Sequence, residues 1–344
     1  MNKFSKQVAR GFIFLALLAV AAPVLAQRPI CINLGTTAPE GSPWHELLQQ
    51  MGQDWNGASK GTVTVRIYPG GVLGDEAEML RKARIGQLHA VGLSGSGLAI
   101  TERSVLCFHI PLMIESYEEL DYLRDRMAPK IEALLLAKGL VVLNWSDVGW
   151  VHFFTKTPAR SPDEIRKMKL FTSAGDPETE ALYKEFRFQP VPLSVNDLLP
   201  SLQTGMIEAI DVPPLFALLD QSFGLAKNML PVKWTSLVGA TVVNKSTWER
   251  IPEPLRSELM KIARDSGNKF RDRIRKLGDE AIVEMQKRGL NVMPLDEPTL
   301  TRWRTESAAA YPKLRGHYVP ADLFDETLRL RDEFRRTHPL TPGK

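Results

Sequence analysis

The sequence contains very little cysteine. Only Cys31 and Cys107 occur among its 344 residues, and two cysteines are too few for a zinc-ribbon site. In an oxidising compartment the two thiols could form a disulfide. The alternative is a pair of small, buried, unpaired side chains. The sequence leaves both possibilities open, because it does not fix the distance between the two Cα atoms.

The chain also lacks a large excess of charge of either sign. Its formal net charge is +4, and removal of the first 26 residues takes away three basic residues and leaves +1. No basic stripe with interleaved aromatic residues is present. Nucleic acid is therefore not an expected partner. Beyond the N-terminus, no segment approaches the roughly 20 apolar residues that a membrane-spanning helix needs.

Complete catalytic and metal-binding motifs are missing as well. Residues 92–96 approach the G-x-S-x-G pattern of a nucleophile elbow, but the last position is serine. Residues 95–100 lack the third glycine of a dinucleotide-binding fingerprint. The six histidines are scattered without an i, i+4 pair, and we interpret His89 and His109 as structural. We therefore expect no cofactor, no metal and no enzymatic activity.

The N-terminus has the pattern of a secretory signal peptide. Lys3, Lys6 and Arg10 precede an uncharged apolar run over residues 11–22, and residues 24–26 are Val-Leu-Ala. We predict cleavage after Ala26 and a periplasmic mature protein. The alternative is a retained anchor, for which the apolar run is short.

The rest of the chain alternates strand and helix patterns. Apolar residues from Trp44 to Trp55 recur at helical spacing, and residues 63–67 alternate as a strand. Strands are predicted at 140–145 and at 151–155, and a long charged helix at about 254–288. This alternation predicts an α/β fold of two lobes, since about 318 residues usually divide in this way.

In α/β sheets, ligands bind beyond the carboxyl ends of the strands. Two lobes that face each other through such ends would form a cleft. The segments that follow predicted strands, and are therefore expected at this cleft, are residues 36–44, 68–74, 94–97, 146–150, 171–176 and 211–214.

Several motifs, in order and spacing, are similar to those of one known family. They are residues 35–44 (GTTAPEGSPW), 61–78 with G-x-V-x-V and L-G-x-x-x-E, 109–112, 190–211 with Leu-Gln-Thr-Gly, and 242–245. On these motifs the mature chain resembles the DctP-type solute receptors of tripartite ATP-independent periplasmic (TRAP) transporters.

The resemblance implies a bilobed periplasmic-binding-protein fold, called a Venus flytrap, with hinge strands and a long bracing helix. It places residues 27–148 and about 237–276 in lobe I, and residues 149–236 and about 277–344 in lobe II. It also implies a receptor that delivers a small organic solute to TRAP permease subunits in the membrane. A periplasmic enzyme or a ligand sensor on the same fold is the alternative.

The chain departs from the family where an arginine usually binds a carboxylate, because Phe171 stands at that position. We therefore expect a ligand other than a simple C4 dicarboxylate, and aromatic surroundings suit apolar, aromatic or cationic ligands. Phe171 could instead pack in the core, Trp145 could do the same, and Asp176 could serve only as a helix cap. Lys169 is an alternative source of positive charge. The predicted ligand-binding residues are Trp44, Ser94, Trp145, Asp147, Trp150, Phe171, Asp176, Asp211 and Pro213.

Overall fold

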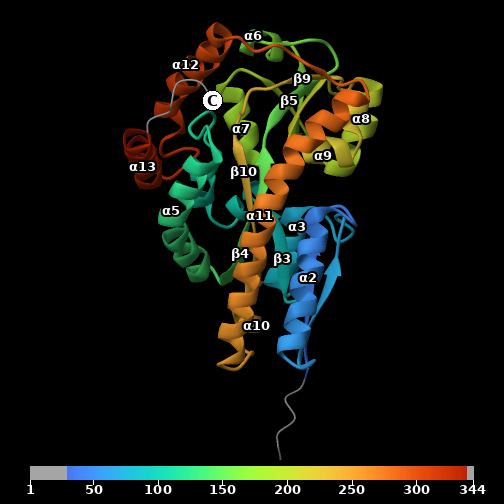
Figure 1. Cartoon of the computed structure of the whole chain (residues 1–344), viewed down its shortest axis with the longest axis vertical. Helices are drawn as coiled ribbons and strands as arrows, with labels where there is room; N and C mark the ends of the chain where they lie inside the picture. The colour runs from blue at the N-terminus through green and yellow to red at the C-terminus, as the bar shows by residue number, and fades with distance from the viewer. Residues whose placement is uncertain (1–28, 339–344) are drawn as a thin grey trace, which may run out of the picture.

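The computed structural model describes residues 29–338, so the predicted signal peptide lies outside the described residues. The strands form two separate sheets, which lie one above the other along the length of the molecule (Figure 1). The first has the order β2-β1-β3-β10-β4 and the second the order β11-β9-β5-β8-β6-β7. This arrangement confirms the predicted α/β fold of two lobes.

The first sheet is mixed, because β1 is parallel to β2 and β3, whereas β10 is antiparallel to β3 and β4. In the second sheet β6 is parallel to β7 and β8, and β5 is antiparallel to β8 and β9. The strands of the first sheet are β1 (Ile30–Thr36), β2 (Val63–Tyr68), β3 (Ala90–Ser94), β4 (Leu140–Trp150) and β10 (Ser236–Asn244). Those of the second are β5 (His152–Thr155), β6 (Lys169–Ser173), β7 (Gln189–Leu193), β8 (Ala209–Val212), β9 (Asn228–Leu230) and β11 (Asn291–Val292).

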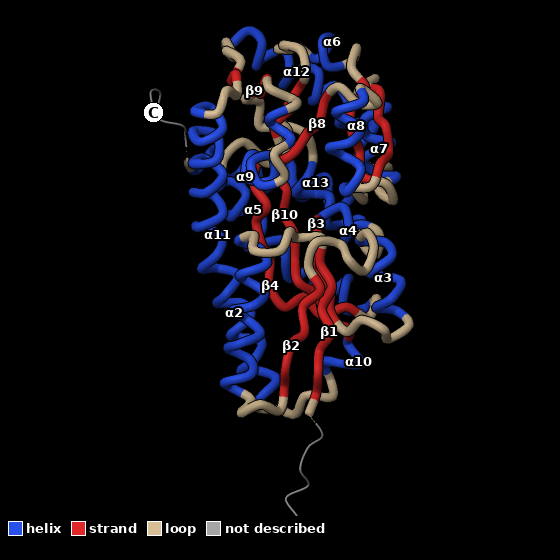
Figure 2. Tube along the Cα trace, turned by 90° about the vertical axis from the view of Figure 1, so that its right-hand side faces the viewer, coloured by secondary structure: helices blue, strands red, loops and turns tan. Residues whose placement is uncertain are grey.

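Helices surround both sheets (Figure 2). Several begin where a side chain caps the first turn, as Asp75 does for α3 and Ser116 for α5. The longer helices are α2 (Pro43–Ala58), α3 (Glu76–Arg84), α5 (Tyr117–Ala137), α7 (Pro177–Glu185), α11 (Leu255–Lys287), α12 (Glu297–Leu314) and α13 (Ala321–Thr337). The shorter ones are α4 (Gly95–Ala99), η1 (Arg103–His109), α6 (Pro162–Ile165), η2 (Val195–Asp197), α8 (Leu198–Thr204), α9 (Pro214–Leu219), η3 (Ser222–Gly224) and α10 (Lys245–Trp248).

Two adjacent strands connect the lobes. β4 continues to Trp150, five residues beyond its predicted end, and pairs with β10 from Leu140 to Trp150. The chain then enters β5 at His152, in the second sheet. Residues 146–150, which were predicted to form a loop at the cleft, are therefore part of a hinge strand. The ladder with β10 supplies the hydrogen bonds that local sequence alone does not predict.

The long helix α11 braces both lobes. It has 33 residues and agrees closely with the predicted helix at 254–288. It packs against β4 and α2 of the first lobe and against α9 beside the second sheet (Figure 1).

The segment after α11 contacts both lobes in turn. α12 lies against the second lobe, where the Trp303 indole N–H donates to the Arg160 carbonyl over 2.9 Å. α13 instead packs against α5 and η1, and Lys130 of α5 pairs with Asp322 over 3.0 Å. These contacts differ from the predicted assignment of all of residues 277–344 to lobe II. The reason is a chain reversal after α12 that returns α13 to the flank of the first lobe.

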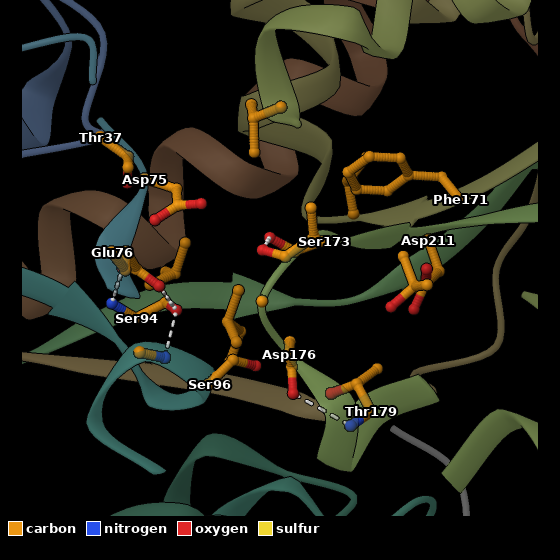
Figure 3. A pocket seen from close by; sticks show the side chains of 18 of the residues that line it. Thr37, Asp75, Glu76, Ser94, Ser96, Phe171, Ser173, Asp176, Thr179 and Asp211 are labelled. Carbon is orange, nitrogen blue, oxygen red and sulfur yellow. Dashed lines mark hydrogen bonds between the residues drawn. The ribbon is translucent and has the colours of Figure 1, made fainter. Parts of the chain in front are cut away.

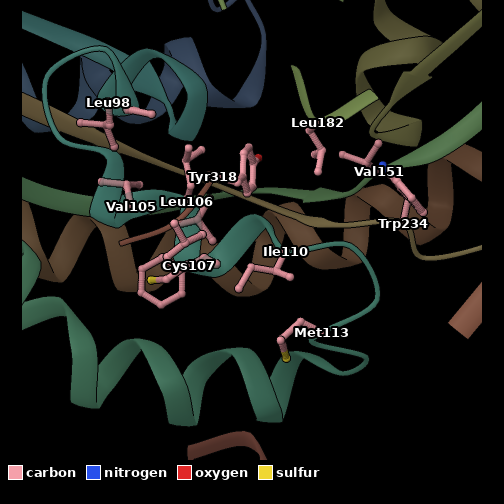
Figure 4. Close-up of a cluster of buried hydrophobic side chains, with 14 of the residues drawn as sticks. Leu98, Val105, Leu106, Cys107, Ile110, Met113, Val151, Leu182, Trp234 and Tyr318 are labelled. Atoms are coloured by element: carbon pink, nitrogen blue, oxygen red, sulfur yellow. The ribbon is translucent and has the colours of Figure 1, made fainter. Parts of the chain in front are cut away.

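Buried apolar side chains run from one lobe into the other. One cluster combines Leu106 and Ile110 of the first lobe with Val151 and Trp234 at the crossing (Figure 4). Cys107 lies inside this cluster, whereas Cys31 is exposed on β1, and both thiols are free. The cysteines therefore do not form the disulfide that the sequence permitted. Within residues 29–338, no helix is long and apolar enough to cross a membrane.

Candidate functional site

A cavity of ≈ 380 Å³ lies between the two lobes. Its walls come mainly from the segments that follow β1, β2, β3, β6, β7 and β8, so the carboxyl ends of strands from both sheets meet there. Figure 3 shows side chains from both lobes around this space. Its polar and acidic walls include Thr37, Asp75, Glu76, Ser94, Ser96, Thr172, Ser173, Asp176, Thr179, Tyr183, Asn196 and Asp211.

The first lobe contributes an acidic wall at the start of α3. Asp75 is the N-cap, and its carboxylate accepts a hydrogen bond from the Glu78 amide over 2.8 Å. The next residue, Glu76, accepts from the Ser94 amide over 2.5 Å and from the Ser94 hydroxyl over 2.6 Å (Figure 3). Burial raises the pKa of Glu76, against the lowering effect of these two bonds. Ser94 thus holds a buried carboxylate in place at the cavity wall.

The second lobe contributes two further carboxylates. Asp176 caps α7 and accepts from the Thr179 amide over 3.0 Å. Asp211, at the end of β8, accepts a hydrogen bond from the Tyr183 hydroxyl. Burial raises the pKa of Asp211 to about 7, and Asp176 adds to the rise, while the Tyr183 hydrogen bond opposes it. Asp176 is therefore both a helix cap and a cavity residue, so the two interpretations of it are compatible.

Aromatic and apolar side chains complete the second-lobe wall. Phe171 lies on β6, lines the cavity and packs in a core cluster that includes Leu198 and Leu202. Pro213 lines the cavity directly after β8. Lys169 is exposed and does not line the cavity, so it is not the alternative source of positive charge that the sequence offered.

Within the described part of the chain, no permanently charged cationic side chain lines the main cavity. Among the described residues 29–338, no lysine or arginine lines it. His109 does line it, but burial lowers the pKa of this histidine to about 4. Its Nε2 accepts from the Val238 amide over 3.2 Å, which requires the neutral ring. Over the same residues, no three histidine, cysteine, aspartate or glutamate side chains are placed to hold a metal ion.

Four predicted ligand-binding residues lie outside the main cavity, and three of them, Trp145, Asp147 and Trp150, are on the hinge strand β4. Side chains alternate along a strand, so Val148 faces the cavity while Asp147 faces the opposite side. The Asp147 carboxylate pairs there with Arg124 and, over 2.6 Å, with Arg275. The prediction for Asp147 is corrected accordingly, because its charge is already balanced inside the protein.

The two tryptophans of β4 also have partners elsewhere. The Trp145 indole N–H donates to Glu132 of α5 over 2.9 Å, on the outer side of the sheet. Trp150 is buried against Tyr117, with ring centroids 5.2 Å apart. The intervening Gly149 has φ +122°, which breaks the regular alternation of the strand. Neither indole ring lines the cavity between the lobes.

A second, smaller cavity of ≈ 120 Å³ adjoins the first. It is mainly apolar and is lined by Trp44, Leu47 and Leu48 from the start of α2, with Phe216 from α9. The Trp44 indole N–H donates to the Asp147 carbonyl over 3.2 Å, which fixes the ring beside the hinge. The predicted residue Trp44 therefore lies at this neighbouring cavity and not at the main one.

Several residues of the main cavity were not predicted from the sequence. His109, Tyr183, Trp234 and Tyr318 line it from helices, from the crossing and from the C-terminal segment. None of these four residues directly follows a parallel strand. The rule that ligands bind beyond the carboxyl ends of strands therefore does not predict them. The segment after β7 does follow a strand, but it was not among the segments predicted at the cleft, although Ser194 and Asn196 line the cavity.

The two lobes touch at the edge of the cavity. Arg103 of η1 pairs with Glu178 of α7 over 3.2 Å, and both side chains are partly exposed. A Cβ placed on Gly175 would lie 3.6 Å from the Ala77 Cβ, which is ordinary van der Waals contact. The lobes are therefore close together around the cavity, as in a receptor that encloses a ligand.

Comparison with known proteins agrees with this architecture. The chain is 24% identical over 276 residues to the C4-dicarboxylate-binding periplasmic protein DctP of Rhodobacter capsulatus, covering 79% of this chain and 82% of that one. It is 21% identical over 252 residues to the 2,3-diketo-L-gulonate-binding periplasmic protein YiaO of Escherichia coli, covering 73% and 74%.

Solved structures have the same fold. A TRAP periplasmic solute-binding protein from Ralstonia eutropha H16, with bound (S)-2-acetolactate, superposes with a TM-score of 0.82 at 21% identity, covering 88% of this chain and 99% of that one. A second, from Pseudomonas putida F1 with bound D-glucuronate, gives 0.79 at 23% identity, covering 86% and 96%.

The family itself follows from a match over most of the chain. The DctP family model, described as bacterial extracellular solute-binding protein, family 7, matches residues 34–316. Members of this family are solute-binding proteins of transport systems and not enzymes. The chain therefore belongs to the DctP family, the bacterial extracellular solute-binding proteins of family 7.

Proposed function

We propose that this receptor encloses one small organic solute in the main cavity and presents it to the membrane subunits of a TRAP permease. The mature protein would act in the periplasm after cleavage behind Ala26, without catalysing a reaction. The observation that carries the proposal is the cavity itself, whose ≈ 380 Å³ suits a small molecule and whose walls come from both lobes.

The ligand is, in this proposal, not a simple C4 dicarboxylate. A dicarboxylate needs a cationic partner when it is buried. Phe171 stands where the family resemblance would place an arginine, and Lys169 lies away from the cavity. This distinguishes the chain from the R. capsulatus relative, whose name states that it binds C4 dicarboxylates.

A thermal-shift screen of the protein without residues 1–26 tests the proposal. A solute that binds only the folded state at 100 times its Kd stabilises it by about 2.7 kcal/mol. For a protein of this size that stabilisation corresponds to a rise in Tm of roughly 4 °C. The screen includes C4 dicarboxylates, sugar acids, aromatic acids, amines and uncharged compounds. If no class raises the Tm, the receptor proposal fails. If dicarboxylates raise it most, the receptor role survives and the ligand exclusion is wrong.

A further inference from the structure

The main cavity is lined by four carboxylates, those of Asp75, Glu76, Asp176 and Asp211, and by no lysine or arginine of the described residues. Two of the acids come from the start of α3 in the first lobe, and two from the ends of β6 and β8 in the second (Figure 3). When the lobes are together, the acids face a shared space. An anionic ligand there would be repelled from both sides, and a cation would be attracted from both.

We propose that the solute is an organic cation, with an ammonium or amidinium group held among the cavity carboxylates and an apolar body against Phe171 and Phe216. This inference rests on the proposed receptor function and names the ligand class of the same cavity. It differs from the two solved relatives above, whose bound ligands are acetolactate and D-glucuronate.

Helix dipoles oppose the negative electrostatic field of the cavity carboxylates but do not reverse its sign. The N-termini of α3 and α7 point at the cavity, and each is equivalent to roughly half a positive charge. Each is already capped by a carboxylate, Asp75 for α3 and Asp176 for α7. The negative charges of the Asp75 and Asp176 carboxylates together exceed the two positive half-charges of the helix dipoles. Glu76 and Asp211 add further negative charge whenever they are ionised. The net field in the cavity therefore favours a cation.

Two hydrogen-bonding groups in the cavity wall are left without protein partners. Thr172 is 2% exposed and Trp234 is 1% exposed, and both residues line the cavity. The Thr172 hydroxyl and the Trp234 indole nitrogen have no hydrogen-bond partner among residues 29–338. Buried polar groups are nearly always satisfied. The Thr172 hydroxyl can accept a hydrogen bond from an ammonium group, whereas the Trp234 indole N–H can only donate and would need an acceptor atom elsewhere in the ligand.

The wall also suits an organic cation better than a metal ion. The carboxylates are spread around the cavity, and no three potential ligands among the described residues come together for a metal. Phe171, Phe216 and Trp234 line the same space. Aromatic rings attract ammonium and guanidinium groups through their negative faces and also cover apolar carbon. A cation with a carbon skeleton uses both kinds of wall.

Two pairs of probes with matched skeletons test the charge preference. Putrescine and succinate each have four carbon atoms and carry charges of opposite sign. Phenethylamine and 3-phenylpropionate share the phenylethyl group and differ in the charged end. Isothermal titration at pH 8, with the protein lacking residues 1–26, measures the affinity of each. We expect at least one amine to bind at least tenfold more tightly than its acid partner.

Isosteric variants then locate the charge that is recognised. In Asp176→Asn the side-chain oxygen still caps α7, and in Asp211→Asn an oxygen still accepts from Tyr183. Each variant should weaken binding of the amine by about tenfold or more, because hydrogen bonds to charged groups are worth that much. Asp332→Asn is the matched control, since its side chain is 60% exposed on α13, away from the cavity. It should leave the affinity unchanged.

The outcomes separate the ligand class from the receptor function. Tighter binding of the acids, no binding of either amine, or full amine affinity in both asparagine cavity variants would each overturn the cationic class. Acid binding would leave the receptor proposal intact, because a solute would still be captured. Failure of every compound class in the wider thermal screen would remove both proposals together.

Discussion

Removal of the Asp147 carboxylate should destabilise the protein without removing its ligand site. Asp147 is 1% exposed, and its carboxylate bonds Arg124 and Arg275 at the hinge. Both arginines also share Asp121, whose side chain is 29% exposed. In Asp147→Ala, the buried Arg124 keeps only this shared and partly hydrated partner. The loss leaves positive charge uncompensated inside the protein.

Breaking a buried ion pair by removal of one partner costs about 3–5 kcal/mol. The unfolding entropy is about 2.1 cal/mol/K per residue near 60 °C, so a folded region of about 310 residues has roughly 0.65 kcal/mol/K. The Tm of Asp147→Ala should therefore fall by about 5–8 °C. Asp332→Asn, which loses an exposed pair worth at most about 1 kcal/mol, should change the Tm by less than about 2 °C.

Differential scanning calorimetry of both variants, with urea unfolding as a second measurement, provides the comparison. Titration of the folded Asp147 variant with the probe that binds best to the wild type completes it. We expect a lower Tm and an affinity within a few-fold of the wild type. An unchanged Tm combined with loss of binding would refute the structural role and return Asp147 to the ligand site.

Two further predictions concern the lobe contact and the acidity of the cavity. Glu178→Gln removes the exposed pair with Arg103, worth about 0.2–1 kcal/mol, so fluorescence energy transfer between labelled lobes should show a 1.4- to 5-fold shift towards the open form. The effect should vanish in 1 M salt, and a larger or salt-independent shift would contradict it. Asp211 has a folded pKa of about 7 against an ordinary value of 3.8, so the folded state holds the extra proton between these values. The free energy of unfolding of the protein should therefore fall as pH rises from about 4 to 7. Asp211→Asn should show a shallower fall, and an identical pH profile would exclude the raised pKa.

Local chemistry explains what the sequence predicted well. Asp75 and Ser116 are short polar side chains that precede amphipathic runs, which is the sequence pattern of an N-cap, and both accept the expected backbone hydrogen bond. The helix at 254–288 was predicted within a residue or so of its observed bounds, Leu255–Lys287. Such features depend on neighbouring residues only, so tertiary structure does not change them.

The hinge strand shows where local chemistry is insufficient. Residues 146–149 read Ser-Asp-Val-Gly, a composition typical of a turn, yet they continue β4 because β10 pairs with them. The error moved Asp147 and Trp150 from a strand to an imagined loop at the cleft, and placed Trp145 directly before that loop. Only the partner strand, about 90 residues later in the sequence, determines which of these side chains faces the ligand.

The two aspartates Asp147 and Asp211 show what separates a structural carboxylate from a candidate ligand-binding one. Both follow or end apolar strand segments, and the sequence alone treats them alike. In the structure Asp147 has two arginine partners, whereas among residues 29–338 the Asp211 carboxylate has only the Tyr183 hydroxyl as a side-chain partner and lies near Asp176. Burial without a compensating cation is costly, and proteins retain it mainly where a ligand or a reaction uses it. The missing counter-charge, and not the residue type, is therefore the feature that makes Asp211 a candidate ligand-binding residue.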